Sequence, residues 1–197
     1  MGRTRSFNDY RVLAATAQLF RKLGFTATSL KDLERTTGLQ AGSLYHAFGN
    51  KKAIFLRALD AYCDSVVRRR ITTYLKGVRP LQELEEFFTS TYETEKNPSA
   101  GCLLTNSATE IGANDREINT KIEEGFSLLR AAFASHIRLA HQRGLIQTQL
   151  SADAAAEFLL TAYQGLLVRL RNGTPPRILS EIIHLTIRSL SMQQPTN

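Results

Sequence analysis

The spacing of apolar residues between helix breakers constrains the fold of this chain more than any other feature. Apolar side chains recur three and four residues apart, the period of an amphipathic helix, and we find no segment with the alternation of a strand. Glycine, proline and asparagine interrupt this pattern along the chain. The sequence therefore predicts an all-α fold of about nine helices. They are expected over residues 9–23, 30–37, 41–48, 51–76, 81–96, 102–111, 115–143, 151–172 and 175–190.

Positive charge is concentrated near the N-terminus. The first 60 residues contain ten Lys or Arg and four Asp or Glu, a net charge of +6, whereas the other 137 residues contain 15 basic and 14 acidic residues. A nucleic-acid-binding module joined to an electrically neutral domain has this distribution. We therefore expect a DNA-binding domain over residues 1–50 and a larger second domain over residues 51–197, with the helix 51–76 connecting the two.

Other protein classes find little support in the sequence. Its two cysteines make no disulfide framework, no window is long and apolar enough for a transmembrane helix, and the polar, basic start lacks the apolar core of a signal peptide. His136 and His141 are five residues apart and diverge on a helix, and no Gly-rich phosphate loop or nucleophile elbow is present. We expect a soluble, cytoplasmic protein without a catalytic residue, metal site or cofactor.

Two short helices joined by a tight turn follow the first predicted helix. Ser29 and Asp32 are typical of an N-terminal cap, and Gly38 ends the first of the two helices. The second is too short and polar for a core element, since only Leu44 and Phe48 would face inward. This is the geometry of a helix-turn-helix, whose second helix enters the DNA major groove. The outward side chains that could hydrogen-bond base edges or phosphates are Gln40, Ser43, Tyr45 and His46.

Residues 9–57 resemble the DNA-binding domain of the TetR family of transcriptional regulators. The run from Thr28 to Leu39 is similar to the family's first motif helix and turn. The run from Gln40 to Lys52 is similar to its recognition helix, with the hallmark Tyr, Phe and Asn-Lys in place. Over the rest of the chain, the helix count, the helix lengths and the segment Gly101-Cys102-Leu103-Leu104 match a subset of the family.

The resemblance implies roles for individual residues in DNA binding. Thr28 or Ser29 would contact a phosphate, and Gly42 would let the protein backbone and the DNA come close. Because Ala41 and Gly42 offer no long side chain, sequence discrimination would depend on few residues and on DNA shape. The residues expected at bases are Gln40, Gly42 and Ser43, with Lys31 contributing to discrimination, and those expected at phosphates are Tyr45, His46 and Lys51. Arg3 and Arg5 could reach the minor groove or phosphates. The alternative is that Tyr45 and His46 are ordinary exposed side chains.

The resemblance also implies that the second domain binds a small-molecule effector. In the family, helices at these positions enclose the ligand cavity, and an aromatic lining with few polar groups suits a small, mostly apolar ligand. Each aromatic residue could instead be plain core. The expected ligand-binding residues are Phe87, Phe88, Tyr92, Cys102, Asn106, Glu110, Phe126 and Tyr163, with Phe133 between the DNA module and the last two helices as well.

The last two helices, about residues 152–192, are apolar on too many sides for a small monomer. The family pattern implies that they pack against their symmetry mates as a four-helix bundle. The resulting homodimer would present two recognition helices to a palindromic operator in double-stranded DNA. The alternative is that both are core helices of a monomer.

The two cysteines receive different interpretations. Cys102 is expected in the first turn of a helix, whose dipole favours the thiolate, and some members with this segment are thought to respond to electrophiles or oxidants. A small buried hydrophobe is the alternative, and Cys63 is expected to be structural.

Together these features predict a repressor that a small-molecule effector releases from its operator. The effector would shift the helices around residues 81–111 and through them the helix that starts at Lys51. The alternatives within DNA binding are a regulator that senses electrophiles through Cys102, a transcriptional activator and a nucleoid-type protein without an effector. A protein-interaction module that has lost DNA binding is a further alternative.

Overall fold

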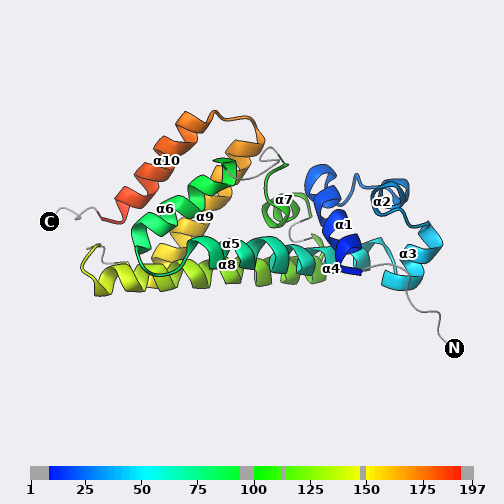
Figure 1. The fold of residues 1–197 in the computed structure, drawn as a ribbon, viewed down its shortest axis with the longest axis horizontal. Coiled ribbons are helices and arrows are strands. Elements are labelled where there is room, and N and C mark those ends of the chain that lie inside the picture. The colour runs from blue at the N-terminus through cyan, green and yellow to red at the C-terminus, as the bar shows by residue number, and fades with distance from the viewer. Residues whose placement is uncertain (1–8, 94–99, 112–113, 147–149, 192–197) are drawn as a thin grey trace. The chain divides into compact units, whose positions relative to one another are not determined.

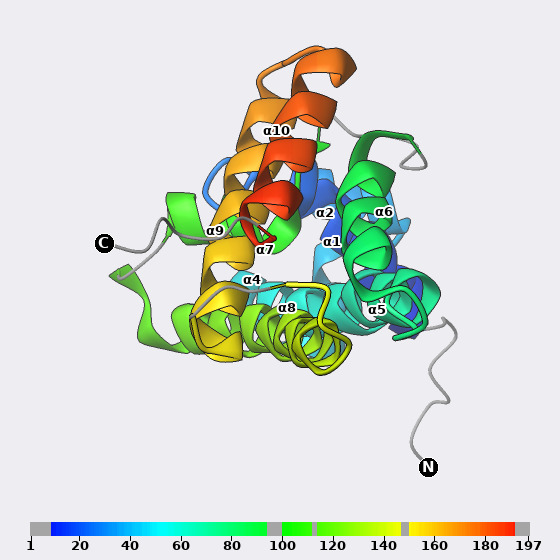
Figure 2. The ribbon, with the colours of Figure 1, turned by 90° about the vertical axis from the view of Figure 1, so that its left-hand side faces the viewer.

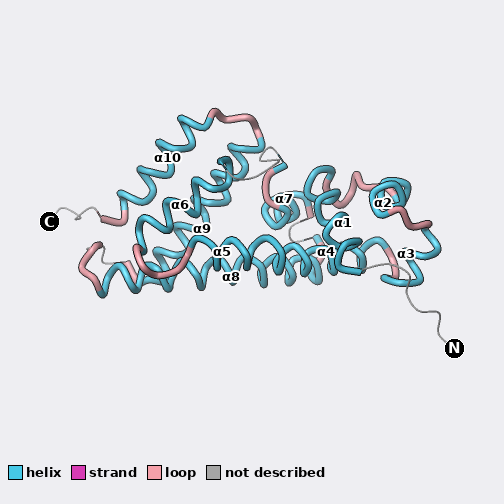
Figure 3. The backbone as a smooth tube through the Cα atoms, in the orientation of Figure 1, coloured by secondary structure: helices cyan, strands magenta, loops and turns pink. Residues whose placement is uncertain are grey.

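The computed structural model describes residues 9–93, 100–111, 114–146 and 150–191. Within these ranges the regular structure is helical throughout, which confirms the predicted all-α fold (Figure 1 and Figure 3). Arg3, Arg5 and the residues 94–96 and 192, which the sequence predicts to be in the N-terminal arm and in two helices, lie outside the described residues. The elements are α1 (Asp9–Leu23), α2 (Leu30–Thr37), α3 (Ala41–Phe48), α4 (Lys51–Tyr62), η1 (Cys63–Arg68), α5 (Arg69–Tyr74), α6 (Pro80–Glu93), α7 (Leu103–Glu110), α8 (Arg116–Gln142), α9 (Ala152–Arg171) and α10 (Pro176–Ser189). With α4, η1 and α5 taken as one continuous helix, the described ranges contain nine helices.

The boundaries of the short helices follow from local side-chain chemistry. Ser29 caps α2 because its hydroxyl accepts the N–H of Asp32, while the Asp32 carboxylate accepts the N–H of Ser29 at 3.0 Å. Gly38 ends α2 in the left-handed conformation, with φ of 72°, which a residue without a Cβ adopts readily. Asn50 begins α4 by accepting the N–H of Ala53 at 2.9 Å. These caps fix where α2 and α4 start without any distant contact.

A π-helical segment interrupts the helix that runs from Lys51 to Tyr74. The sequence predicts regular helix here, and η1 is instead wound more widely over Cys63–Arg68. Such segments are rare and carry no strong sequence signature, and this one contains neither Gly nor Pro. The helix ends at Tyr74 rather than at the predicted residue 76.

The chain forms two compact units. Unit 1 combines the residues up to Val66 with Cys102–Glu123, and unit 2 combines Val67–Gly101 with Glu124 and the residues that follow it. Helix α7 therefore packs with α1 and α4 in unit 1. The domain limits 1–50 and 51–197 stay a prediction.

Each unit has its own core. In unit 1, α1 packs on α4, and Phe20, Leu33, Leu44 and Phe55 are fully buried. In unit 2, α10 packs on both α6 and α9, and α9 and α10 run side by side (Figure 2). The burial of one apolar stripe on each helix is the main favourable term that holds these cores together.

Candidate nucleic-acid interface and effector site

Two apolar side chains of helix α3 are buried in the core of unit 1, and its polar side chains are exposed. Leu44 is fully buried and Phe48 is nearly so, which confirms the predicted inward pair. The side chains predicted to face DNA stand on the opposite side of the helix: Gln40, Ser43, Tyr45 and His46 are all exposed. An α3 fixed in this way can present polar groups without losing its position.

The first turn of α3 has an unusual cap. Gln40 occupies the N-cap position, but its side chain makes no capping hydrogen bond. The Glu34 carboxylate, on α2, accepts the N–H of Ala41 at 2.6 Å instead. Glu34 was not among the residues singled out from the sequence, because the two positions are seven residues apart and belong to different helices.

Packing within unit 1 does not require glycine at position 42. Beyond its chain neighbours and the backbone of its own helix, a Cβ at this position would meet no atom within 4 Å, and the residue is exposed. The surface of α3 at Gly42 is therefore open to a close approach from outside the chain.

The structure separates the two residues proposed for a phosphate at the start of α2. Thr28 is buried and its hydroxyl donates to the carbonyl of Gly24 at 2.5 Å. Ser29 is exposed, although its hydroxyl is occupied by Asp32 at 2.6 Å. Lys31 in the first turn of α2 is exposed as well. Ser29 and Lys31 are thus the predicted residues of α2 that lie on the surface.

The two lysines that open α4 are engaged within unit 1. Lys51 donates from Nζ to the carbonyl of Thr26 at 3.3 Å, and Nζ lies 4.7 Å from the ring centroid of Phe25. Lys52 pairs with Asp115 at 2.8 Å and with Glu117 at 2.9 Å, and hydrogen bonds to these two carboxylates raise its pKa. The charge of Lys52 is thus balanced by two carboxylates at the start of α8.

Three of the predicted ligand-binding residues belong to unit 1. Cys102 is the N-cap of α7 and is buried, with its Sγ accepting a hydrogen bond from the Tyr62 hydroxyl at 3.6 Å. The Asn106 amide donates to the Arg21 carbonyl at 3.0 Å. Glu110 accepts two backbone N–H groups of the turn after α1. The structure therefore places these three polar groups in contacts with α1, α4 and the turn between α1 and α2.

The other five predicted ligand-binding residues belong to unit 2. Phe87, Phe88 and Tyr163 are buried in one aromatic cluster together with Phe133, with ring centroids between 5.1 and 6.4 Å apart. Phe126 is also buried, and Tyr92 is half-buried. The cluster confirms none of the ligand contacts, because aromatic rings at these distances already pack against one another.

Unit 2 also contains a cleft along α6. Its volume is about 370 Å³. Its lining is more acidic than the apolar cavity that the sequence suggested, because it contains three glutamates of α6. The lining residues are Tyr74, Gln82, Glu85, Glu86, Thr89, Ser90 and Glu93.

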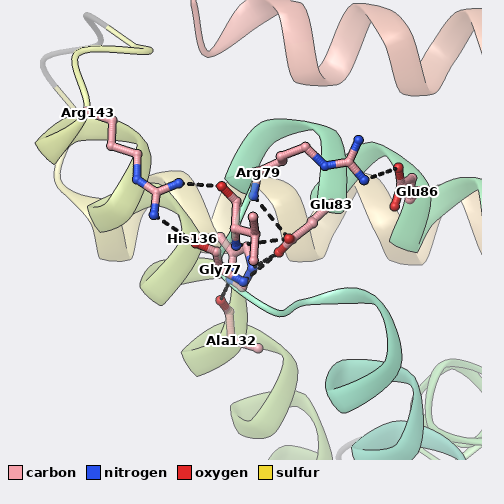
Figure 4. Close-up of polar contacts among 8 residues, drawn as sticks. Gly77, Arg79, Glu83, Glu86, Ala132, His136 and Arg143 are labelled. Carbon is pink, nitrogen blue, oxygen red and sulfur yellow. Dashed lines mark hydrogen bonds and ion pairs between the residues drawn. The ribbon is translucent and has the colours of Figure 1, made fainter.

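A buried polar network of unit 2 holds the turn before α6 (Figure 4). The Glu83 carboxylate accepts the N–H groups of Gly77 at 2.6 Å and of Val78 and Arg79 at 3.0 Å. It also lies 3.0 Å from Nε2 of His136. Arg143 donates to the carbonyl of Gly77 at 2.9 Å and to that of Val78 at 2.5 Å. The turn is thus held by a carboxylate on its N–H side and a guanidinium on its carbonyl side.

The hydrogen bonds to Glu83 keep its carboxyl group ionised at neutral pH. Burial raises its pKa, but hydrogen bonds from the Arg79 amide, from His136 and from the amides of Gly77 and Val78 outweigh burial and lower the pKa to about 2. Nδ1 of His136 faces the Ala132 carbonyl at 3.1 Å. Both ring nitrogens therefore face oxygen atoms, Nε2 the Glu83 carboxylate and Nδ1 the Ala132 carbonyl. The sequence missed this pair, because Glu83 and His136 lie 53 positions apart.

Two other features of the described ranges bear on function. No group of three or more His, Cys, Asp or Glu among them could hold a metal ion. None of their helices combines the length and apolar character needed to cross a membrane.

Comparison with known proteins gives one consistent result. The family model for bacterial regulatory proteins of the TetR family matches residues 12–58, and the model for tetracycline-repressor-like C-terminal domains matches residues 77–184. The transcriptional repressor ComR of Escherichia coli is 27% identical over 190 residues, which cover 95% of this chain and 90% of that protein. The repressor DhaR of a Mycobacterium species is 26% identical over 156 residues, which cover 78% of this chain and 77% of that protein.

Solved structures agree in fold. A cysteine mutant of the TetR-family regulator CifR, complexed with 26-bp operator DNA, has a TM-score of 0.82 at 23% identity, covering 95% of this chain and 99% of that chain. The reduced form of Escherichia coli NemR has a TM-score of 0.81 at 17% identity, covering 96% of this chain and 100% of that chain. The narrower resemblance to the subset with Gly101-Cys102-Leu103-Leu104 stays a prediction. Because the two family models together span most of its length, the chain belongs to the TetR family of bacterial transcriptional regulators.

Proposed function

We propose that this chain is a one-component repressor that binds a palindromic operator as a homodimer and is released by a small-molecule effector. The observation that carries this proposal is the way α3 is packed and exposed. Leu44 and Phe48 fix the helix to the core, while its polar side chains remain exposed. ComR and DhaR are both named as repressors. Because these matched relatives are regulators, we infer a cytoplasmic regulator rather than an enzyme.

The proposed DNA contacts follow from what each predicted residue does in unit 1. Gln40, Gly42 and Ser43 would approach the bases, because they are exposed and carry no internal role that fixes their identity. Ser29, Lys31, Tyr45 and His46 would contact phosphates or adjust the fit. The open surface at Gly42 supports a close approach of DNA to the backbone of α3.

The proposed dimer interface is an apolar stripe on α9 and α10. Phe158, Val168 and Leu185 are 44%, 40% and 64% exposed in the single chain. On α9, Phe158, Gly165 and Val168 fall at helical spacing on one exposed face. Large exposed apolar side chains of this kind mark association surfaces, and a two-fold axis would bury them against their own copies.

The proposed effector binds in unit 2 and acts on unit 1. The two candidate binding sites are the aromatic cluster around Phe87 and the acidic cleft along α6. Two helical stretches, residues 51–74 and 116–142, each contain residues of both units and offer a covalent route for the coupling. An effector weakens DNA binding only if it binds the DNA-incompetent state more tightly.

A second candidate function is sensing through Cys102. The specific observation in its favour is the hydrogen bond from the Tyr62 hydroxyl, on α4, to Sγ at the N-cap of α7, because a chemical change at this sulfur would break a direct contact between α7 and α4. Alkylation with N-ethylmaleimide should then reduce operator binding of a Cys63→Ser variant and leave a Cys102→Ser variant unaffected. Equal responses of the two variants would exclude this function.

The main proposal is tested by selecting random duplex DNA on the purified protein and sequencing what is retained. A palindromic motif with half-sites about one helical turn or more apart is expected. Ser43→Ala should relax the sequence preference at one position of each half-site. If the retained DNA has no common motif and the affinity does not depend on sequence, the proposed repressor function is refuted.

A further inference from the structure

The turn between α1 and α2 is held by a carboxylate that comes from far along the sequence. The N–H groups of Phe25 and Thr26 donate to the two carboxylate oxygens of Glu110, at 2.8 and 2.7 Å. Backbone N–H groups in a turn need a partner, and here one side chain at the end of α7 supplies both. Three residues after Thr26, Ser29 caps α2.

A second residue on the same face of α7 binds the end of α1. Asn106 lies one helical turn before Glu110, and its amide donates to the Arg21 carbonyl at 3.0 Å. Arg21 lies in the last turn of α1, where carbonyls have no partner within the helix. Asn106 and Glu110 therefore bind the end of α1 and the turn that follows it.

The fit around Glu110 is close. A Cβ on Gly24 would lie 2.7 Å from Glu110 Oε2, so a larger residue there would displace the carboxylate from its present position. On its other side the turn is held by Lys51, through the Thr26 carbonyl and the ring of Phe25. That ring in turn packs against Phe55, with centroids 4.8 Å apart.

The charge of Glu110 opposes a purely electrostatic role in DNA binding. Burial raises its pKa, but hydrogen bonds from the amides of Thr26 and Phe25 outweigh burial and lower the pKa, so the group is a carboxylate at neutral pH. A negative charge in the unit that contains α3 repels phosphates, and its removal alone would strengthen DNA binding. The hydrogen bonds to the turn have the opposite consequence, because they fix the entry to α2.

We propose that Glu110 is a positioning residue for operator binding: its carboxylate sets the α1–α2 turn and thereby the start of α2, where Ser29 and Lys31 face the DNA. This assigns Glu110 to the DNA-binding machinery instead of the effector lining, and it rests on the proposed function. Asn106 supports the same arrangement from the end of α1.

The test compares Glu110→Gln with Glu117→Gln in the full-length chain. Both substitutions remove one negative charge from unit 1, but Glu117, which is 64% exposed, pairs with the side chain of Lys52 and holds no turn. Affinity for the selected operator is measured at fixed salt and well below the melting temperature of each variant. Amide hydrogen exchange of Phe25 and Thr26 is followed by NMR. We expect Glu110→Gln to bind at least tenfold more weakly and to exchange these two amides faster, while Glu117→Gln binds as tightly as the wild type or more tightly.

The other outcomes are distinguishable. Wild-type or tighter binding by Glu110→Gln, or a lower melting temperature with unchanged affinity, would overturn the positioning role. If Glu110→Gln does not fold, Glu110→Asp keeps the charge and withdraws the carboxylate by one methylene. It should show the same loss of affinity, and full affinity would overturn the proposal. Absence of a sequence-specific site for the wild-type protein would instead refute the proposed function.

Discussion

Replacing Glu83 by Gln should destabilise unit 2 by an amount that the structure allows us to work out. The pKa of Glu83 is lowered from an ordinary value of 4.5 to about 2. A difference of roughly 2.5 pKa units at about 1.4 kcal/mol per unit gives about 3.5 kcal/mol of stabilisation at pH 7. The amide of Gln keeps one acceptor oxygen, but its NH₂ group would face donors of the turn. For a chain of this size the loss corresponds to a melting temperature lower by roughly 7–14 °C.

The sign of the pH dependence follows from the direction of the shift. Because the folded-state pKa is lowered, the stabilisation is complete above the unfolded-state pKa and disappears as the pH falls toward 2. The difference in the free energy of unfolding between wild type and Glu83→Gln should therefore fall by about half from pH 5 to pH 3. Acidification protonates the Glu83 carboxylate of the wild type and removes its stabilisation, whereas Glu83→Gln has no carboxylate to protonate at this position.

Urea unfolding followed by far-UV circular dichroism measures this difference, since the chain contains no Trp for fluorescence. Protein concentration is held fixed, because dimerisation contributes to apparent stability. Glu86→Gln is the matched control. Glu86 lies on the same helix but pairs at the surface with Arg79 at 3.4 Å, a contact worth at most about 1 kcal/mol. Equal losses for the two variants, or a pH-independent loss for Glu83→Gln, would refute the reasoning.

Three further predictions concern DNA binding, the stability of α3 and assembly. Gly42→Ala should raise the free energy of unfolding by up to about 1 kcal/mol, since a Cβ there meets nothing within 4 Å. In a gel-shift assay it should nevertheless weaken operator binding, and unchanged affinity would exclude a close approach of DNA at this residue. Glu34→Ala should lower stability by about 1 kcal/mol in urea unfolding because the Ala41 N–H loses its acceptor, whereas Glu34→Gln should stay near wild type. Leu185→Glu should convert the dimer to monomers in analytical ultracentrifugation, and Val78→Glu, at a side chain 68% exposed, should not. If Leu185→Glu remains a dimer, the interface does not include Leu185 and lies elsewhere.

The sequence by itself determined the helices and the motif, because both depend on contacts within a few residues. The capping pair Ser29 and Asp32, the stop at Gly38 and the start at Asn50 are hydrogen bonds or backbone conformations that neighbouring residues create. The inward pair Leu44 and Phe48 follows from helical periodicity. Periodicity did not reveal the π-helical segment η1, since its residues are ordinary helix formers.

Tertiary structure alone decided what the polar side chains do, because their partners lie far away in sequence. Glu110 binds backbone amides 84 and 85 positions earlier, and Glu83 meets His136 across 53 positions. A carboxylate satisfies whichever donors the fold brings within about 3 Å, and periodicity carries no information about such partners. The sequence therefore assigned Glu110 to a ligand site through family resemblance, and only packing showed that its carboxylate holds the turn before α2.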